Sequence, residues 1–305
     1  MTRVRRLKLL LCLMLALVSC LAAAFWAWPV SFFRGYSELR MYLSGAQSLT
    51  TRVAGYRIHY YALGPEAGQP VILVHGLGAR AEDWQNLAPY LARAGYRVYL
   101  PDLPGFGQSE KPANFSYSIS DEASVVVGFL DALKLRQVDL GGWSMGGWIV
   151  QRVAAGQPAR VRKLLLFDSA GIYELPTWDT RLFTPTTPAE LDQLDALLMP
   201  NPPRVPDFVA SDILRHAKRN AWVIRRALAS MLTGRDTTDG LLPRLTMPVL
   251  IVWGAEDRIT PISQGEKMHS LIPHSQLEII LGCGHLAPSQ CVTQVGPEVV
   301  QFVKQ

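Results

Sequence analysis

Short β-rich runs alternate with longer amphipathic runs through most of this 305-residue chain, and such alternation is compatible with few architectures. After a polar connector around residues 44–51, residues 57–61 alternate as a half-exposed strand does. Six more runs are typical of buried strands: residues 71–74, 96–100, 138–140, 164–167, 249–253 and 277–281. Helical patterns lie between some of them, at residues 84–94, 121–133 and 145–155. The chain is therefore predicted to form an α/β fold with a mostly parallel sheet flanked by helices.

The alternation stops for about 75 residues before Pro248. Prolines interrupt this segment, and two helical stretches remain visible in it. Leucines at positions 191, 194, 197 and 198 mark an apolar face on the first, and residues 207–232 form the second. We therefore expect an inserted helical cap at residues 172–241, between two parts of one α/β core at residues 50–171 and 242–305.

The N-terminal segment, residues 1–33, is strongly apolar from Leu7 to Trp28. As a helix this stretch would span about 33 Å, enough to cross the hydrocarbon core of a bilayer. The cations that precede it, Arg3, Arg5, Arg6 and Lys8, would hold the N-terminus in the cytoplasm. The segment is predicted to be a membrane anchor with the rest of the chain extracytoplasmic.

Two alternatives share that orientation. Small residues at 22–24 are compatible with a cleaved signal peptide and a secreted protein. The sequence Leu17-Val18-Ser19-Cys20 resembles a lipobox, in which case Cys20 would be lipidated. The apolar run continues to Phe33, past both cleavage points, and this favours the uncleaved anchor.

Charge and cysteine content exclude some functions. The formal net charge is +5, but the N-terminal cations account for all except about one unit, so no basic face indicates nucleic-acid binding. The cysteines do not have zinc-site spacing, and no metal site is predicted. Cys283 and Cys291 are interpreted as buried free thiols, with a disulfide as the alternative in an oxidising compartment.

The most informative motif is Gly142-Trp143-Ser144-Met145-Gly146, which follows a predicted strand and opens a predicted helix. This strand-turn-helix context is what a nucleophile elbow requires. The turn is tight, and glycines relieve the crowding while the serine hydroxyl points out above the sheet. Ser144 is therefore the candidate nucleophile.

A serine hydroxyl needs a base within hydrogen-bond reach and an acid that orients the base. In the chain order serine, acid, histidine, only His285 directly follows a buried strand, so it is the candidate base. Asp257 and Asp168 both follow strands, and Asp257 is favoured because it precedes the histidine in the usual position. Asp168 is interpreted as a structural group.

An oxyanion hole needs two backbone N–H groups. The residue after the nucleophile, Met145, would supply one. The glycine-rich turn His75-Gly76-Leu77-Gly78 would supply the other through the Leu77 N–H. His75 itself is interpreted as a turn-stabilising residue.

Taken in order, the motifs H-G-L-G, D-L-P-G-F-G-Q-S, G-W-S-M-G-G, W-G-A-E-D-R and G-C-G-H resemble those of the α/β-hydrolase superfamily, from about Tyr56 to Phe302. With an N-terminal anchor, the chain looks most like membrane-bound monoacylglycerol-lipase-type esterases and related bacterial lipases. The resemblance implies a cap over an acyl pocket, no cofactor, and hydrolysis of a small-molecule or lipid ester.

Relatives that share the serine triad also include carbon–carbon bond hydrolases, perhydrolases, aminopeptidases and methyl esterases, and the motifs do not separate these chemistries. Dehalogenase and epoxide-hydrolase chemistry is excluded because those relatives place Asp where this chain has Ser144. A non-catalytic binding protein on the same fold is a further alternative, which the intact Ser, Asp and His set disfavours.

Overall fold

An eight-stranded sheet forms the centre of the computed structural model, which describes residues 3–305. The first two residues of the predicted N-terminal segment lie outside the described range. The strand order is β1-β2-β4-β3-β5-β6-β7-β8, and all neighbours are parallel except β1 with β2 and β2 with β4. The strands are β1 (Gln47–Val53), β2 (Tyr56–Leu63), β3 (Pro70–Val74), β4 (Arg97–Pro101), β5 (Val138–Trp143), β6 (Val161–Phe167), β7 (Val249–Gly254) and β8 (Ser275–Ile280).

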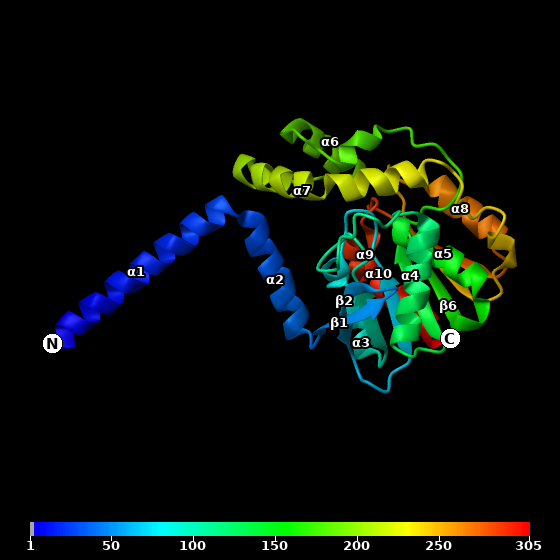
Figure 1. Ribbon diagram of the computed structural model, residues 1–305, viewed down its shortest axis with the longest axis horizontal. Helices are drawn as coiled ribbons and strands as arrows, with labels where there is room; N and C mark the ends of the chain where they lie inside the picture. The colour runs from blue at the N-terminus through cyan, green and yellow to red at the C-terminus, as the bar shows by residue number, and fades with distance from the viewer. Residues whose placement is uncertain (1–2) are drawn as a thin grey trace.

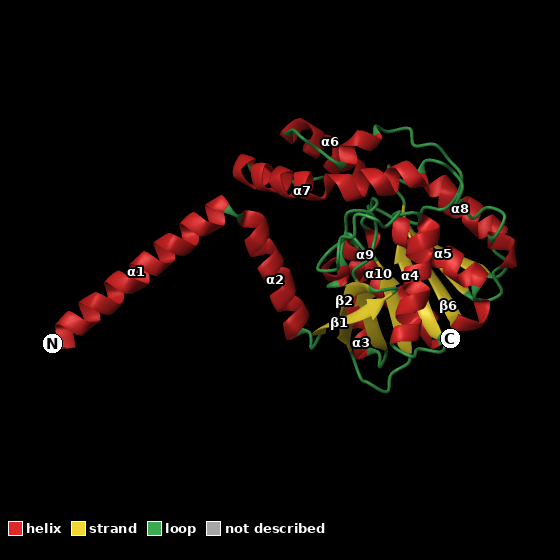
Figure 2. Ribbon diagram, viewed as in Figure 1, coloured by secondary structure: helices red, strands yellow, loops and turns green. Residues whose placement is uncertain are grey.

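Helices cover both faces of this sheet (Figure 2). On one face the core includes α4 (Ile119–Ala132), α5 (Met145–Gly156) and α8 (Ile262–Leu271). On the other it includes α3 (Ala88–Arg93), α9 (Ala287–Gln290) and α10 (Val292–Lys304). Central strands such as β5 and β7 are buried along their whole length, which explains their continuous apolar runs. The α/β fold with a mostly parallel sheet is confirmed.

The edges of the sheet differ from expectation in three places. Part of the predicted polar connector at residues 44–51 belongs to β1, an edge strand whose exposed face explains its polar composition. Strand β2 is buried from Ile58 onward because its alternate side chains pack into the cores on both faces of the sheet. Strand β8 was expected to be buried, but it pairs only with β7 and is largely half-exposed.

The helix expected at residues 84–94 is shorter than predicted. A 3-10 turn, η1, occupies Ala81–Trp84, and α3 begins only at Ala88. Pro89 lies in the first turn of α3, where its missing N–H is tolerated, and this favours a helix start at that point. The helices predicted over residues 121–133 and 145–155 are present as α4 and α5, with small differences at their ends.

The segment between β6 and β7 holds helices that lie above the sheet (Figure 1). They are α6 (Pro188–Leu198) and α7 (Asp207–Met231). The same segment contains the short 3-10 helices η3 (Thr180–Phe183) and η4 (Leu242–Arg244). Helix α6 starts with a capping box in which Thr187 and Glu190 each accept a hydrogen bond from the other's backbone N–H. We call residues 172–241 the cover.

The N-terminal residues form α1 (Arg3–Ala27) and α2 (Pro29–Leu43), and α1 projects away from the rest of the molecule (Figure 1). Residues 10–27 are long and apolar enough to cross a membrane by length and composition, with a mean hydropathy of 2.4. The junction of the two helices contacts the cover helix α7. Asp212 accepts a hydrogen bond from the Val30 N–H at 2.9 Å, and Arg215 donates to the Ala27 carbonyl at 2.6 Å.

Candidate active site

The turn between β5 and α5 holds Ser144 in a conformation that L-residues rarely adopt, with φ 55° and ψ −119°. The turn closes so tightly that a Cβ on Gly142 would lie 2.2 Å from the Gly146 carbonyl oxygen. A Cβ on Gly146 would lie equally close to the Val74 carbonyl oxygen on β3. The glycines on either side of the serine are therefore required by close backbone approach.

Three side chains from separate loops form one hydrogen-bonded chain. The Nε2 atom of His285 lies 2.8 Å from the Ser144 hydroxyl oxygen, and its Nδ1 lies 2.8 Å from Oδ2 of Asp257. His285 and Asp257 are buried, while Ser144 is half-buried. An Nδ1–H donating to the carboxylate leaves Nε2 as an acceptor for the serine O–H. The structure thus brings together the three residues that the sequence singled out.

The Asp257 carboxylate is held by more than the histidine. Its Oδ1 accepts from the backbone N–H groups of Ile259 at 2.8 Å and Thr260 at 3.0 Å, and its Oδ2 accepts from the Thr260 hydroxyl at 2.7 Å. That hydroxyl also lies 3.2 Å from His285 Nδ1. Sequence reasoning missed Thr260, although its place three residues after an Asp in a turn is typical of a side-chain-to-backbone bonded loop.

Opposing effects act on the pKa of His285. Burial lowers it, whereas the charge of Asp257, the hydrogen bond to Asp257 and the charge of Asp168 raise it, and the net effect is a raised pKa. The imidazolium that forms when the ring accepts a proton is therefore stabilised inside the protein. This is the electrostatic property that a general base for a serine hydroxyl needs.

Asp168, the other candidate acid, does not contact His285 by a hydrogen bond. Its carboxylate accepts from the backbone N–H groups of Gly254 at 2.7 Å and Ala287 at 3.1 Å, so it links the ends of β6 and β7 to α9. Burial and the nearby Asp257 charge raise the pKa of Asp168 to about 8. These contacts support the interpretation of Asp168 as a structural group.

The loop that carries His285 is fixed from several sides. Cys283 and Cys291 form a disulfide that brackets the histidine, which contradicts the expectation of free thiols. The reason is spatial: the loop folds back into α9, so the two Cα atoms come within 6.4 Å of each other. The backbone N–H of His285 donates to the Leu198 carbonyl at the end of α6. The backbone carbonyl of His285 accepts a hydrogen bond from the Trp143 indole N–H.

The predicted oxyanion-hole residues lie on either side of the serine. Met145 is the first residue of α5, and the turn containing Leu77 packs against Ser144, since a Cβ on Gly76 would lie 3.2 Å from the serine Cβ. His75 is buried, with Nδ1 2.8 Å from the Gly76 carbonyl and Nε2 accepting from the Leu103 N–H at 3.0 Å. Burial lowers the pKa of His75, and both ring nitrogens are used in holding the turn.

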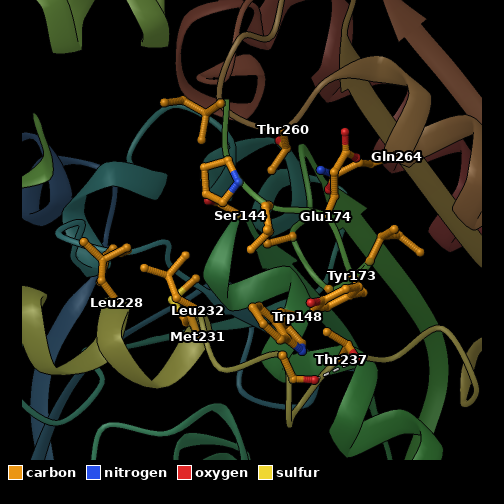
Figure 3. Close-up of a pocket in the computed structure, with 18 of the residues that line it drawn as sticks. Ser144, Trp148, Tyr173, Glu174, Leu228, Met231, Leu232, Thr237, Thr260 and Gln264 are labelled. Carbon is orange, nitrogen blue, oxygen red and sulfur yellow. Dashed lines mark hydrogen bonds between the residues drawn. The ribbon is translucent and has the colours of Figure 1, made fainter. Parts of the chain in front are cut away.

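Ser144 opens onto a mainly apolar pocket of about 110 Å³ between the strand ends and the cover (Figure 3). We call it the apolar pocket. The lining side chains that sequence reasoning did not single out include Trp148, Ile172, Phe183, Leu228, Met231 and Leu232. Leu228 and Met231 lie in the last turns of α7, and Leu232 directly follows it. The sequence predicted this helix but not which of its residues would line a pocket. Glu174 is the one charged lining residue among residues 3–305.

Within residues 3–305, no group of three or more His, Cys, Asp or Glu side chains is arranged to hold a metal ion. Polar side chains in the lining of the apolar pocket include hydroxyls, an amide and a carboxylate, those of Ser144, Thr237, Thr260, Gln264 and Glu174. The arrangement can supply a nucleophile and a base in an apolar surrounding.

A model of the alpha/beta hydrolase family matches residues 71–295. Among curated proteins, the chain is 31% identical to a 2-hydroxy-6-oxo-2,4-heptadienoate hydrolase of Pseudomonas putida, over 72% of this chain and 83% of that protein. It is 26% identical to Lipase 1 of Psychrobacter immobilis, over 90% of this chain and 87% of the lipase. These relatives are hydrolases with different reactions.

Among solved structures, the chain resembles a membrane phospholipase A described as a bacterial virulence factor. The TM-score is 0.79 and the sequence identity 26%. The match covers 97% of this chain and 99% of the other, so it extends into α1.

Proposed function

Because the chain belongs to the α/β-hydrolase family and is a hydrolase, we propose that it cleaves carboxylic esters through Ser144, His285 and Asp257. The observation that supports this best is the continuous hydrogen-bonded chain from Asp257 through His285 to the Ser144 hydroxyl. This series of hydrogen bonds ends at Ser144, which lines the apolar pocket. The proposed nucleophile therefore faces the space where a substrate would bind.

In the proposed mechanism the Ser144 oxygen attacks the ester carbonyl while His285 Nε2 takes the hydroxyl proton. Asp257 holds the imidazole orientation and stabilises its positive charge. The tetrahedral intermediate collapses when His285 returns the proton to the leaving alcohol, and an acyl-enzyme remains. A water molecule deprotonated by the same histidine then attacks the acyl-enzyme and releases the acid.

The backbone N–H groups of Leu77 and Met145 are proposed to stabilise the oxyanion. Within residues 3–305 neither N–H donates a hydrogen bond to another protein group, so both are free to bind the developing charge. Met145 lies at the N-terminus of α5, where the helix dipole also favours negative charge. The mechanism uses only side chains, backbone amides and water.

The substrate is proposed to be a lipid-like acyl ester, such as a monoacylglycerol. The lining of the apolar pocket suits a hydrocarbon chain, and residues 172–241, as a cap, would close over it. Among similar proteins, a lipase and a membrane phospholipase A support an acyl-ester substrate.

We further propose that α1 anchors the protein in a membrane with the catalytic part on the extracytoplasmic side. Support comes from the apolar length of α1, the cations at its N-terminal end and the cystine at the His285 loop, which suits an oxidising compartment. A cleaved signal peptide or lipidation at Cys20 would leave the catalytic part in the same compartment. Mass determination of the N-terminus after membrane extraction distinguishes these forms.

The test of ester hydrolysis uses the full chain in detergent micelles. A fluorophosphonate probe should label Ser144, as mapped by mass spectrometry, and the unlabelled protein should hydrolyse p-nitrophenyl esters, with octanoate preferred over acetate. Ser144→Ala should remove both label and turnover. A folded protein that neither reacts with the probe nor cleaves any ester would refute the assignment.

Carbon–carbon bond hydrolysis is a second candidate, because a relative named for a dienoate substrate is 31% identical to this chain. Such a substrate carries a carboxylate, whereas the only charged residue that lines the apolar pocket within residues 3–305 is itself a carboxylate, Glu174. The pocket therefore favours esters. Cleavage of a 2-hydroxy-6-oxo-dienoate at a rate above that of every ester tested would reverse this preference.

A further inference from the structure

A second cavity, of about 320 Å³, is lined by residues that neighbour the lining of the apolar pocket in the chain. Leu77 lines the apolar pocket, while the next residue, Gly78, lines this second cavity. On α7, Leu228 faces the first space and Ile224, one helical turn earlier, faces the second. The two spaces are therefore neighbours that share the proposed oxyanion turn as a wall.

Four cationic side chains from separate parts of the chain line this second space, which we call the charged cavity. Arg34 comes from α2, Arg80 from the turn before η1, Lys111 from the loop after β4 and Arg219 from α7. Within residues 3–305, Arg34, Lys111 and Arg219 have no carboxylate oxygen within 4.0 Å. Three positive charges thus converge without a salt-bridge partner.

The cations influence one another. Burial, followed by the charge of Arg80, lowers the pKa of Arg34. Burial, followed by the charge of Arg34, lowers the pKa of Lys111. The charges of Glu82 and Glu38 offset part of this repulsion at Arg34, but the net effect is still a lowered pKa, and a bound anion would relieve the repulsion that remains.

The cavity also contains acceptors. Glu82 is buried; its Oε1 accepts a hydrogen bond from the Tyr61 hydroxyl at 3.3 Å, and Arg80 lies 3.6 Å from its Oε2. That Oε2 has no hydrogen-bond partner among the described residues. Glu38 lies at the same wall, on α2. The lining therefore suits a group that combines an anion with hydrogen-bond donors, as the phosphate and hydroxyls of a glycerophosphate do.

We propose that the charged cavity binds a phosphate carried by the alcohol portion of the ester substrate, and that Arg34, Lys111 and Arg219 supply the charge. This rests on the proposed ester hydrolysis and specifies its substrate. With the acyl chain in the apolar pocket and the carbonyl oxygen at the Leu77 turn, the leaving alcohol extends past that turn into the charged cavity. The wall supplied by Arg34 makes α2 a part of the substrate site.

The test compares two substrates with the same acyl chain, a 1-acylglycerol 3-phosphate and the corresponding 1-acylglycerol, in the same neutral detergent micelles. The readout is the ratio of their kcat/KM values. For the full-length chain the phosphate-bearing substrate should be preferred. Arg34→Gln and Arg219→Gln should each lower the ratio about tenfold, and the double variant about a hundredfold, as expected for lost charge-assisted hydrogen bonds.

Arg225→Gln is the matched control, because Arg225 is an exposed arginine on α7 outside the cavity. It removes one positive charge from the same helix and should leave the ratio unchanged. If the cavity variants and the control lower the ratio equally, the preference reflects only general attraction between the positively charged protein and micelles that carry the phosphate-bearing substrate. The proposal would then be wrong.

A free phosphate is the other source of the same chemistry. Binding of a free phosphate is tested by adding inorganic phosphate to a p-nitrophenyl ester assay and measuring inhibition. Inhibition by phosphate together with a substrate ratio near one would assign the cavity to a free anion and overturn the substrate role. Loss of p-nitrophenyl ester turnover in Ser144→Ala tests the ester mechanism separately, so failure of the two proposals can be told apart.

Discussion

The loops at the carboxyl edge of the sheet and the cover above them are held in different ways. In the loops, polar side chains are buried and bonded several times over, as Asp257 and Asp168 show. In the cover, α6 buries only one side chain, Leu191, and reaches the His285 loop mainly through the Leu198 carbonyl. The loops hold the proposed reacting atoms, whereas the cover lines the space beside them.

Variants in the loops and variants in the cover should therefore affect activity in different ways. Changes at Ser144, His285 or Asp257 in the loops should lower turnover of every substrate, because they disturb the proposed bond-making atoms. Changes in the cover should alter the ratio between substrates, because they alter the space that the acyl chain fills. The predictions below test this separation.

The largest effect is expected from Ser144→Ala, which removes the proposed nucleophile. Turnover of all esters should fall by roughly five to six orders of magnitude, as losses of a serine nucleophile do. Steady-state assays with acetate and octanoate esters, beside a circular dichroism spectrum to verify folding, provide the measurement. A loss confined to one ester would contradict the role of the loops as common machinery.

Asp257→Asn should lower kcat by roughly three to four orders of magnitude for all esters, because the amide cannot hold the histidine in the productive tautomer. Asp168→Asn is the matched control in the neighbouring strand end. The asparagine has one carbonyl oxygen, so it can accept from only one of the two backbone N–H groups that Asp168 binds, and the other N–H is left unsatisfied. The variant should therefore lower the melting temperature by a few degrees. Its effect on kcat should stay below about tenfold.

Leu228→Trp tests the cover, since Leu228 lines the apolar pocket and is 9% exposed. The larger ring should occupy space needed by a medium-length acyl chain. The ratio of octanoate to acetate kcat/KM should fall about tenfold, the scale on which apolar pockets discriminate. Ala229→Leu, at the exposed neighbouring position on α7, should leave the ratio unchanged. If kcat/KM fell equally for both esters, a change in the cover would act as a change in the loops does, and the proposed difference between the two regions would be wrong.

The pH profile should show a smaller effect. His285 must be neutral to act as a base, so kcat/KM should rise with pH through a folded-state pKa that lies above the ordinary histidine value. In Asp257→Asn the charge that raises this pKa is lost while burial still lowers it, and the inflection should move to lower pH. An unchanged inflection in that variant would show that another group controls the profile.

The smallest effect on turnover is expected from Asp212→Asn, at the contact between α7 and the junction of α1 and α2. Weakening its bonds to Val30 and Arg215 should speed hydrogen exchange of a peptide covering residues 28–34. Turnover of p-nitrophenyl acetate should change less than about twofold, because no catalytic loop is touched.

Much of the fold could be predicted from sequence because the central strands are buried on both faces and leave continuous apolar runs, as β5 and β7 do. Edge strands carry a weaker signal. Strand β1 looked like a connector because its polar face is exposed, and β8 looked buried because its composition does not reveal that it has one neighbour.

The sequence also identified the side chains that meet at the candidate site, since strand ends of one sheet edge converge and the motif order is distinctive. It did not single out Thr260 or the charged cavity, and it gave the disulfide only as an alternative to free thiols. The charged cavity depends on how segments remote in the chain approach one another, because Arg34 and Arg219 are brought together by the packing of α2 on α7.

The disulfide between Cys283 and Cys291 has a practical consequence for anyone preparing this protein. The covalent loop that it closes contains His285, so a chain made in a reducing host cytosol would carry its histidine on an uncrosslinked segment. Two preparations from one gene, one folded under oxidising conditions and one not, should therefore differ in specific activity while having the same sequence and nearly the same mass. Thiol titration of a batch should be reported beside its activity.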